Sequence, residues 1–267
     1  MTGRRQSRSS MVAGYRVAWG IGLRGTRAWI MSPPFFVITM LFPLIFLAAF
    51  SGALSPLFYV EGFSYSQGYT AFVYGFVILQ AAAFGGIFTG YSTARDWDIG
   101  FAPRLFLATP RRAPIIAGYV AVAVIRSLIA GTVLTAAVLV AGMKSHAGFT
   151  QGALLVAMVI VVAMITSLWA CGVAMRIRAT RGGPLMYTPI LVVLFATPVY
   201  VPRSLLHGWL GAVVQRNPMT YMVEGSRSLL AGADQAVARG LAFGAVLLAL
   251  ALVWAILGVR HAERSSW

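Results

Sequence analysis

The sequence predicts an all-α integral membrane protein with six transmembrane helices. Hydrophobic residues make up 59% of its 267 residues and charged residues only 10%, and the mean hydropathy is +0.81. Soluble globular domains carry about 25% charged residues. The chain is also divided into apolar segments long enough to cross a hydrocarbon core, which takes about 20 residues in a helix. These observations exclude a soluble globular protein.

Six apolar segments supply the predicted spans. They cover residues 35–54, 69–94, 113–143, 150–175, 184–201 and 238–259. Gly86 and Gly90 in the second segment, and Gly240 and Gly244 in the sixth, stand four residues apart, a spacing that lets two helices approach closely. The single cysteine, Cys171, lies in the fourth segment, so no intramolecular disulfide is possible and we expect a packing role for this side chain.

Positive charge is distributed unevenly over the connections. The net charge of +15 comes from 21 basic and 6 acidic residues. Arginines gather before the first span, after the second, after the fourth and after the sixth. The first-to-second connection has no Lys or Arg and the third-to-fourth only Lys144, while the long fifth-to-sixth connection holds Arg203, Arg216 and Arg227 and is less bound by the charge rule. Because basic residues are retained on the inner side, both termini are predicted to be cytoplasmic. The same rule explains the basic excess without nucleic acid as a partner.

Residues 1–9 are predicted to be a disordered basic N-terminus, and residues 10–31 a helix lying in the membrane interface. On such a helix Arg16, Arg24 and Arg27 share one sector, while Trp19 and Trp29 lie on the other side. A basic face opposite a tryptophan-bearing face is typical of helices in the headgroup plane. The prolines after residue 32 end this helix and turn the chain into the bilayer.

The connection of residues 95–112 is predicted to hold a short helix that docks on a protein. Asp96 and Asp98 precede a segment in which Phe101, Leu105 and Ala108 recur at helical spacing. Two turns of helix are not stable alone, so this segment needs a surface to pack on. The flanking charges favour a charged protein partner, and the alternative is an interfacial loop held by lipid headgroups.

Residues 197–232 are predicted to form a pair of external re-entrant helices. Asn217-Pro218 is typical of a helix start, since Asn caps free N–H groups and Pro suits the first turn. Gly232 is placed to end that helix, and residues 204–214 predict a second short one before it. Two short, half-apolar helices beside a span indicate a segment that enters one leaflet without crossing, covered by protein or lining a cavity.

Several classes of function are excluded by what the sequence lacks. Its one lysine, Lys144, is not part of a phosphate-binding loop. All acids and histidines fall in loops or at span edges, which argues against ion-coupled transport and a membrane-embedded metalloenzyme. Glu224-Gly225-Ser226 lacks the second glycine of a nucleophile elbow. We therefore expect no catalytic residue, metal site or cofactor in this chain.

Apart from Arg239 at the very start of the last predicted span, Arg126 is the one charged residue inside a predicted span. It lies 13 residues past Ala113, roughly 20 Å along a helix. Three roles remain open for it. The side chain either snorkels to the inner interface, pairs between helices, or contacts a substrate or a lipid headgroup.

Two motifs resemble those of the ABC-2 type permeases, the membrane subunits of type V ABC exporters. One is Asn217-Pro218-Met219-Thr220-Tyr221, followed by an R-x-x-L-x-G-like run from Arg227 to Gly232. The other is a D-x-x-x-G…P-R loop, here Asp96 to Gly100 and Thr109-Pro110-Arg111. The resemblance covers nearly the whole length. The chain looks more like the drug and lipid branch of daunorubicin-efflux and nodulation-type permeases, because it lacks the longer basic N-terminal motif that polysaccharide exporters usually carry. Its short first external loop, residues 55–68, argues against a permease with a large periplasmic domain.

The resemblance implies one transmembrane domain over residues 10–260 and a cytoplasmic tail at 261–267. It implies a transport subunit of the bacterial cytoplasmic membrane, not an enzyme, that pairs with a second permease, identical or a sister. Two copies of a separate ATPase would supply ATP and Mg²⁺. The expected activity is export of an amphipathic drug or lipid, with antibiotic resistance as one outcome. The alternatives are a permease for a lipid-linked or capsular glycan and a non-transporting membrane assembly protein.

The resemblance also implies roles for single residues. The loop of residues 95–112 is expected to couple the permease to the ATPase. Many relatives carry Glu where this loop has Asp96 and Asp98. Which of the two acids contacts the ATPase stays open. The expected coupling residues are Asp96, Asp98, Phe101, Arg104 and Leu105. The expected re-entrant motif is Asn217, Pro218, Thr220, Tyr221, Glu224 and Arg227.

Overall fold

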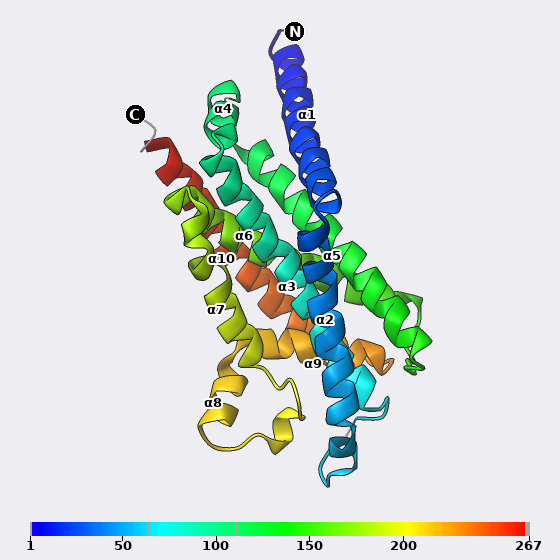
Figure 1. Ribbon diagram of the computed structural model, residues 1–267. Coiled ribbons are helices and arrows are strands. Elements are labelled where there is room, and N and C mark those ends of the chain that lie inside the picture. The colour runs from blue at the N-terminus through cyan, green and yellow to red at the C-terminus, as the bar shows by residue number, and fades with distance from the viewer. Residues whose placement is uncertain (1, 64, 110–111, 265–267) are drawn as a thin grey trace.

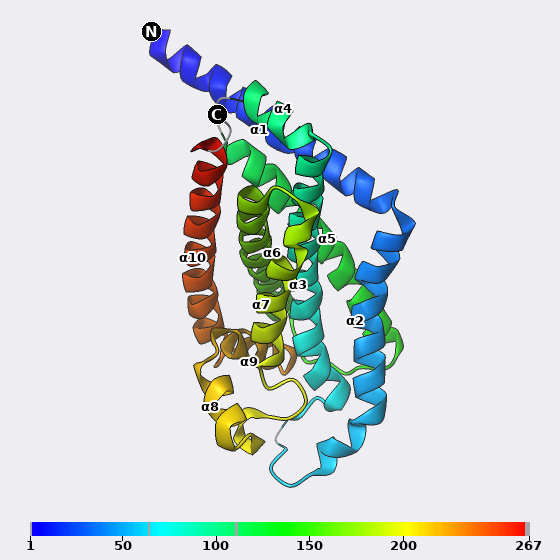
Figure 2. The same cartoon turned by 60° about the vertical axis from the view of Figure 1, so that its left-hand side comes forward.

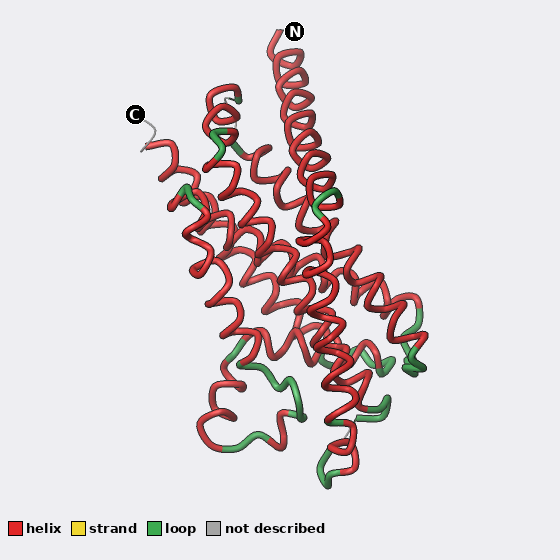
Figure 3. The backbone as a smooth tube through the Cα atoms, viewed as in Figure 1, coloured by secondary structure: helices red, strands yellow, loops and turns green. Residues whose placement is uncertain are grey.

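The computed structural model describes residues 2–63, 65–109 and 112–264, and in this part of the chain the regular structure is helical (Figure 3). The long helices form one bundle (Figure 1). The α-helices are α1 Thr2–Ile30, α2 Pro33–Ala53, α3 Tyr69–Asp98, α4 Phe101–Ala108, α5 Ala113–Val140, α6 Phe149–Ile177, α7 Gly183–Phe195, α8 Gly208–Arg216, α9 Pro218–Leu230 and α10 Val237–Arg264. Short 3₁₀ turns occupy Ser55–Tyr59, Thr180–Gly182 and Arg203–Leu205.

Among the described residues, five helices are long and apolar enough to cross a membrane, namely α2, α3, α5, α6 and α10. The prediction of six full spans differs from this at residues 184–201. That segment forms α7, whose 13 residues extend only about 20 Å. The residue before a proline is biased away from helical dihedrals, and the chain leaves the helix just before Pro198.

Helix α3 is the centre of the bundle. In the most apolar stretch of α3, 89% of the residues are buried, whereas the corresponding stretches of α2 and α10 are 22% buried. The outer faces of α2 and α10 are apolar and exposed. α3 crosses α6 at the two glycines noted in the sequence. A Cβ at Gly90 would lie 2.9 Å from the backbone carbon of Ala170, and one at Gly86 would lie 2.6 Å from the Ser167 nitrogen. The two backbones therefore touch along one helical turn.

Helix α1 lies obliquely across one end of the bundle and packs along α5 (Figure 2). A Cβ at Gly118 of α5 would lie 2.9 Å from the carbonyl oxygen of Ala18. The two tryptophans expected on one face of this helix differ in burial. Trp19 is 62% exposed and remains available to headgroups, whereas Trp29 is only 3% exposed and belongs to the core. α1 also takes in residues 2–9, where the sequence predicts disorder.

The two ends of the bundle differ in construction. α4 lies beside α1 at the end where α10 also finishes, and α10 extends through residues 261–264 of the predicted tail (Figure 2). Residues 265–267 of that tail, and Pro110 and Arg111 of the loop motif, lie outside the described residues. At the opposite end α8 and α9 follow α7, and α9 crosses the bundle transversely (Figure 1). α8 begins later than the predicted residues 204–214, after the 3₁₀ turn.

The glycine contact between α3 and α6 leads to a stability prediction. Gly90→Ala forces the two backbones apart, and overpacking of this kind costs about 1–3 kcal/mol. We expect a clearly lower apparent unfolding temperature for the purified protein. Gly152→Ala is the matched control on α6, because a Cβ there meets no atom within 4 Å. Equal unfolding temperatures for the two variants would show that the helices are not held at this distance.

Candidate functional site

Asn217 stands between α8 and α9 and bonds in two directions. Its Oδ1 accepts a hydrogen bond from the Met219 N–H at 3.0 Å, which caps the start of α9. Its Nδ2 donates to the carbonyl oxygens of Val193 at 2.6 Å and Ala196 at 2.8 Å, at the end of α7. Pro218 occupies the first turn, where no N–H is needed. One side chain therefore closes the end of one helix and the start of another.

Thr220 and Tyr221 do the same for the end of α8. The Thr220 hydroxyl donates to the carbonyl of Val214 at 2.8 Å, and the Tyr221 hydroxyl donates to that of Gln215 at 3.0 Å. The last carbonyls of a helix have no partner within it. Three members of the predicted re-entrant motif, Asn217, Thr220 and Tyr221, thus satisfy three helix ends. We call this region the α7–α9 junction, comprising residues 193–196 and 213–221.

Arg227 and Ser226 attach α9 to the start of α3. The Arg227 Nε donates to the Phe72 carbonyl at 2.9 Å, and its guanidinium carbon lies 3.4 Å from the centre of the Phe72 ring. The Ser226 hydroxyl donates to the Gly75 carbonyl at 2.6 Å. Burial lowers the pKa of Arg227 to about 9, so the side chain remains charged at neutral pH. The buried cation is held by carbonyl oxygens and an aromatic face.

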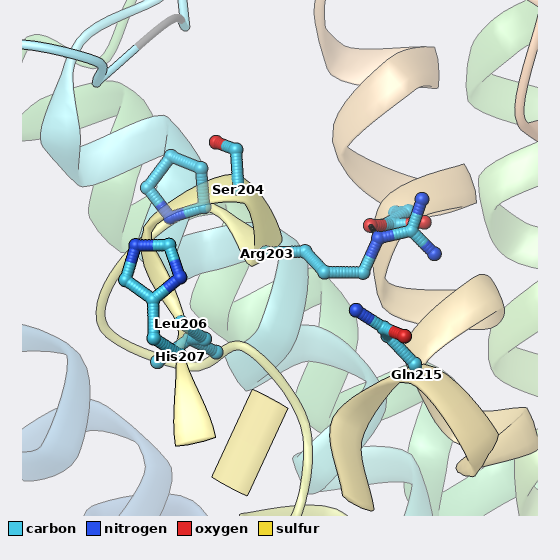
Figure 4. A pocket seen from close by; sticks show the side chains of 7 residues that line it. Arg203, Ser204, Leu206, His207 and Gln215 are labelled. Atoms are coloured by element: carbon cyan, nitrogen blue, oxygen red, sulfur yellow. Dashed lines mark ion pairs between the residues drawn. The ribbon is translucent and has the colours of Figure 1, made fainter. Parts of the chain in front are cut away.

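A cavity of about 470 Å³ opens beside the junction, between the 202–207 loop and α8 and α9. In Figure 4 the Arg203 side chain extends from this loop toward Gln215, with His207 on the other side of the cavity. Arg203 forms an ion pair with Glu224 of α9, with 3.3 Å between Nε and Oε1. Glu224 therefore ties the loop to α9.

At the other end of the bundle, Asp96 and Phe101 are turned inward. Asp96 is only 5% exposed; it accepts a hydrogen bond from the Tyr119 hydroxyl at 2.7 Å and pairs with Arg24 of α1. The Arg24 guanidinium also lies over the Phe101 ring, 3.9 Å from its centre. Asp96 on α3 thus joins α1 and α5 beneath α4.

Asp98 and Arg104 are turned outward. Both are exposed, and the Asp98 carboxylate accepts a hydrogen bond from the Thr180 N–H at 3.1 Å. Leu105 is half-buried against the apolar cluster that includes Phe106. Leu107 is 84% exposed, although the sequence analysis did not single it out. Its position three residues after Arg104 could have indicated this exposure, because residues three apart lie on the same face of a helix.

Gly100 makes the turn between α3 and α4. Its φ of +72° lies in the left-handed region that favours glycine. The turn lets the eight-residue α4 fold back beside α1, and the α4 residues Ala102 and Phe106 are buried. The predicted short helix therefore exists, but the residues it buries on this chain are Ala102 and Phe106. Of the predicted apolar face, Phe101 and Leu105 are half-buried, while Ala108 is exposed, as are Arg104 and Leu107.

Arg126 lies in a second cavity, of about 620 Å³, which we call the elbow cavity. It is lined by α1, the start of α2, the second half of α3 and the first half of α5. Arg126 is only 3% exposed. Its Nη2 donates to the Ser92 hydroxyl at 3.2 Å and its Nη1 lies 3.5 Å from the Thr89 hydroxyl, both on α3. The guanidinium carbon is 5.5 Å from the centre of the Trp29 ring. The side chain thus pairs between helices and does not snorkel to the surface.

The Asp96 pair leads to a second stability prediction. Arg24→Gln leaves a buried carboxylate without its cation, which costs several kcal/mol in a fully buried pair. Since the Arg24 side chain is 41% exposed, we expect a smaller loss, about 1–2 kcal/mol. Adding Asp96→Asn should restore most of the loss in a double-mutant cycle of unfolding temperatures. Arg27→Gln, an exposed position on the same helix, is the control; additive losses would contradict the pairing.

Comparison with known proteins agrees with this architecture. The family model of the ABC-2 type transporter matches residues 21–231, a range that includes the elbow cavity, α4 and the α7–α9 junction. No curated protein matches the chain. The match covers most of the chain, and the described residues include five long apolar helices. This multi-pass membrane protein belongs to the ABC-2 type transporter family, whose members are permease subunits that usually work with a partner ATPase.

Proposed function

We propose that the chain is the permease subunit of an ATP-driven exporter in a bacterial cytoplasmic membrane. It moves an amphipathic, drug- or lipid-like molecule out of the cytoplasm or the inner leaflet. The observation that carries the proposal is α4. Its buried side chains pack on the chain, while Arg104 and Leu107 are exposed at the end of the bundle where α1 and α10 also lie. Such a helix is suited to receive a second protein.

The distribution of arginine supports an orientation with this end in the cytoplasm. Arginines flank α4 and are present in α1, in the α6–α7 connection and at the end of α10. The positive-inside rule places such a set on the cytoplasmic side. The α7–α9 junction is then external, and its short helices shape the outer mouth of the transport path as re-entrant elements.

The inward residues beneath α4 offer a route for mechanical coupling. Two copies of a separate ATPase, which bind ATP and Mg²⁺, would press on the α4 helices of two permease chains. Asp96 connects α3 to Arg24 of α1 and Tyr119 of α5. A displacement of α4 is therefore passed to three helices together. The exposed apolar faces of α2 and α10 are available to lipid and to the second permease, identical or a sister.

The lining of the elbow cavity favours an amphipathic molecule over a glycan. Apolar side chains such as Ile21, Phe88 and Val122 line it beside the arginines. A sugar chain would instead require many polar partners along its path. ATPase stimulation in reconstituted vesicles, measured with drugs, lipids and lipid-linked glycans in turn, separates the two substrate classes. If only lipid-linked glycans stimulated ATPase activity, the assignment to the drug and lipid branch would be contradicted, and with it the expectation of drug resistance.

The outward face of α4 yields a direct test of the ATPase partnership. Arg104→Glu and Leu107→Glu change exposed side chains, so the fold should be retained. Each should lower the amount of co-expressed cognate ATPase that purifies with the chain, and its affinity, by at least tenfold. Arg216→Glu, an exposed arginine at the opposite end, is the matched control and should leave binding unchanged. Retained ATPase after removal of residues 101–108 would disprove docking at α4.

A further inference from the structure

We propose that the elbow cavity binds the phosphate-bearing headgroup of a membrane amphiphile, with Arg126 receiving the anion. The cavity lies inside one chain, under the bend between α1 and α2, and is separate from the exposed face of α4. Three features of the described residues carry the assignment: an uncompensated positive charge, hydrogen-bond donors without a partner, and an apolar compartment beside them. Binding does not require the ATPase, whereas its interpretation as the entrance for an exported molecule rests on the proposed function.

The charges that line the elbow cavity do not balance. Arg24, Arg95 and Arg126 line it together with one acid, Asp96. That acid is already paired with Arg24 and bonded to Tyr119. Within the described part of the chain, no carboxylate lies at ion-pair distance from Arg126 or Arg95. A buried guanidinium without a counter-ion is costly, and an anion in the cavity would remove that cost.

Two side chains that line the same cavity carry donors without a hydrogen-bond partner in the part of the chain that the structure describes. The Nε of Arg126 and the Nε1 of Trp29 are both buried without a hydrogen-bond partner among the described residues. Both side chains line the elbow cavity, and the Trp29 ring is also the one that faces the guanidinium. Buried donors are normally satisfied. Phosphate oxygens accept several charge-assisted hydrogen bonds at once, and a guanidinium matches their geometry.

The size and lining of the cavity indicate a ligand with an apolar part. A volume of about 620 Å³ is typical of small-molecule sites and is far larger than a phosphate ion requires. Ile21, Ala28 and Phe88 form apolar wall beside the arginines. With α4 on the cytoplasmic side, the cavity lies at the level of the inner leaflet. A phosphate headgroup with the first part of its acyl chains satisfies both the charged and the apolar walls.

Binding of short-chain lipids to the purified full chain in a neutral detergent tests the proposal. The probes are dihexanoyl phosphatidate, dihexanoyl phosphatidylcholine and glycerol 3-phosphate, and the readout is the concentration dependence of the unfolding temperature. We expect phosphatidate to raise this temperature most. Arg126→Gln should weaken its apparent affinity at least tenfold, and Arg126→Lys should weaken it less. Arg260→Gln, an exposed arginine at the same end, should leave it unchanged.

The unfolding temperature without lipid separates a binding role from a purely structural one. Because Arg126→Gln removes an uncompensated buried charge, we expect its basal unfolding temperature to equal or exceed that of the wild type. A large basal loss with unchanged phosphatidate affinity in Arg126→Lys would mean that Arg126 only holds helices together, and would overturn the proposal. If Arg126→Gln does not fold, the weaker affinity of Arg126→Lys carries the test.

The probes also distinguish the source of the anion. Equal affinity for glycerol 3-phosphate and phosphatidate would identify a site for soluble phosphates and overturn the lipid assignment. The site itself would be overturned if neither phosphatidate nor glycerol 3-phosphate raised the unfolding temperature. It would also be overturned if Arg260→Gln weakened phosphatidate binding as much as Arg126→Gln does. Neither result would affect ATPase capture by α4, so failure of this inference and failure of the proposed function are separate outcomes.

Discussion

The architecture depends on satisfying the backbone groups of an interrupted chain at the end of an apolar bundle. α7, α8 and α9 are all short, so three sets of helix termini meet within a small volume. Unsatisfied N–H and C=O groups cost several kcal/mol each in hydrocarbon surroundings. The Asn217 side chain bonds free backbone groups at the end of α7 and the start of α9, and Thr220 and Tyr221 bond those at the end of α8. Their role is therefore architectural.

α3 connects this junction to the opposite end of the bundle. Near its start, the carbonyls of Phe72 and Gly75 bind Arg227 and Ser226 of α9. In its middle, glycines place it directly against the backbone of α6. Near its end, Asp96 connects it to α1 and α5. A helix with such contacts along its length is suited to carry a displacement of α4 toward the other membrane face, as the proposed mechanism requires.

Features with a local signal could be predicted from the sequence. Hydropathy located the long spans, the charge pattern gave the basis for an orientation, and Asn217-Pro218 marked the start of α9. Helical spacing also identified α4 as a short helix. In each case the cause lies within a few residues, through capping, proline geometry or the period of the helix. The Gly86–Gly90 spacing indicated a close helix contact, and the structure shows that the partner is α6.

Features set by distant partners could not be predicted. The carbonyls of Val193 and Ala196 at the end of α7 are bonded by the Asn217 amide, more than twenty residues later. Asp96 and Asp98 are two residues apart and look alike in the sequence, yet the first is buried by Arg24 and Tyr119 while the second is exposed. Arg126 finds hydroxyl partners and an aromatic ring on other helices. Tertiary contacts decide these outcomes, and hydrophobic periodicity carries no information about them.

The most direct test of the central claim compares Asn217→Asp with Asn217→Ala by unfolding temperature. Aspartate retains the acceptor that caps α9 but loses the donor to Val193 and Ala196, and it brings a carboxylate against their carbonyl oxygens. A lost cap costs about 1 kcal/mol, whereas a carbonyl left unpaired away from water costs about 1–3 kcal/mol. The account predicts that Asn217→Asp is at least as destabilised as Asn217→Ala. An Asn217→Asp protein as stable as the wild type would show that only the cap matters and would contradict it.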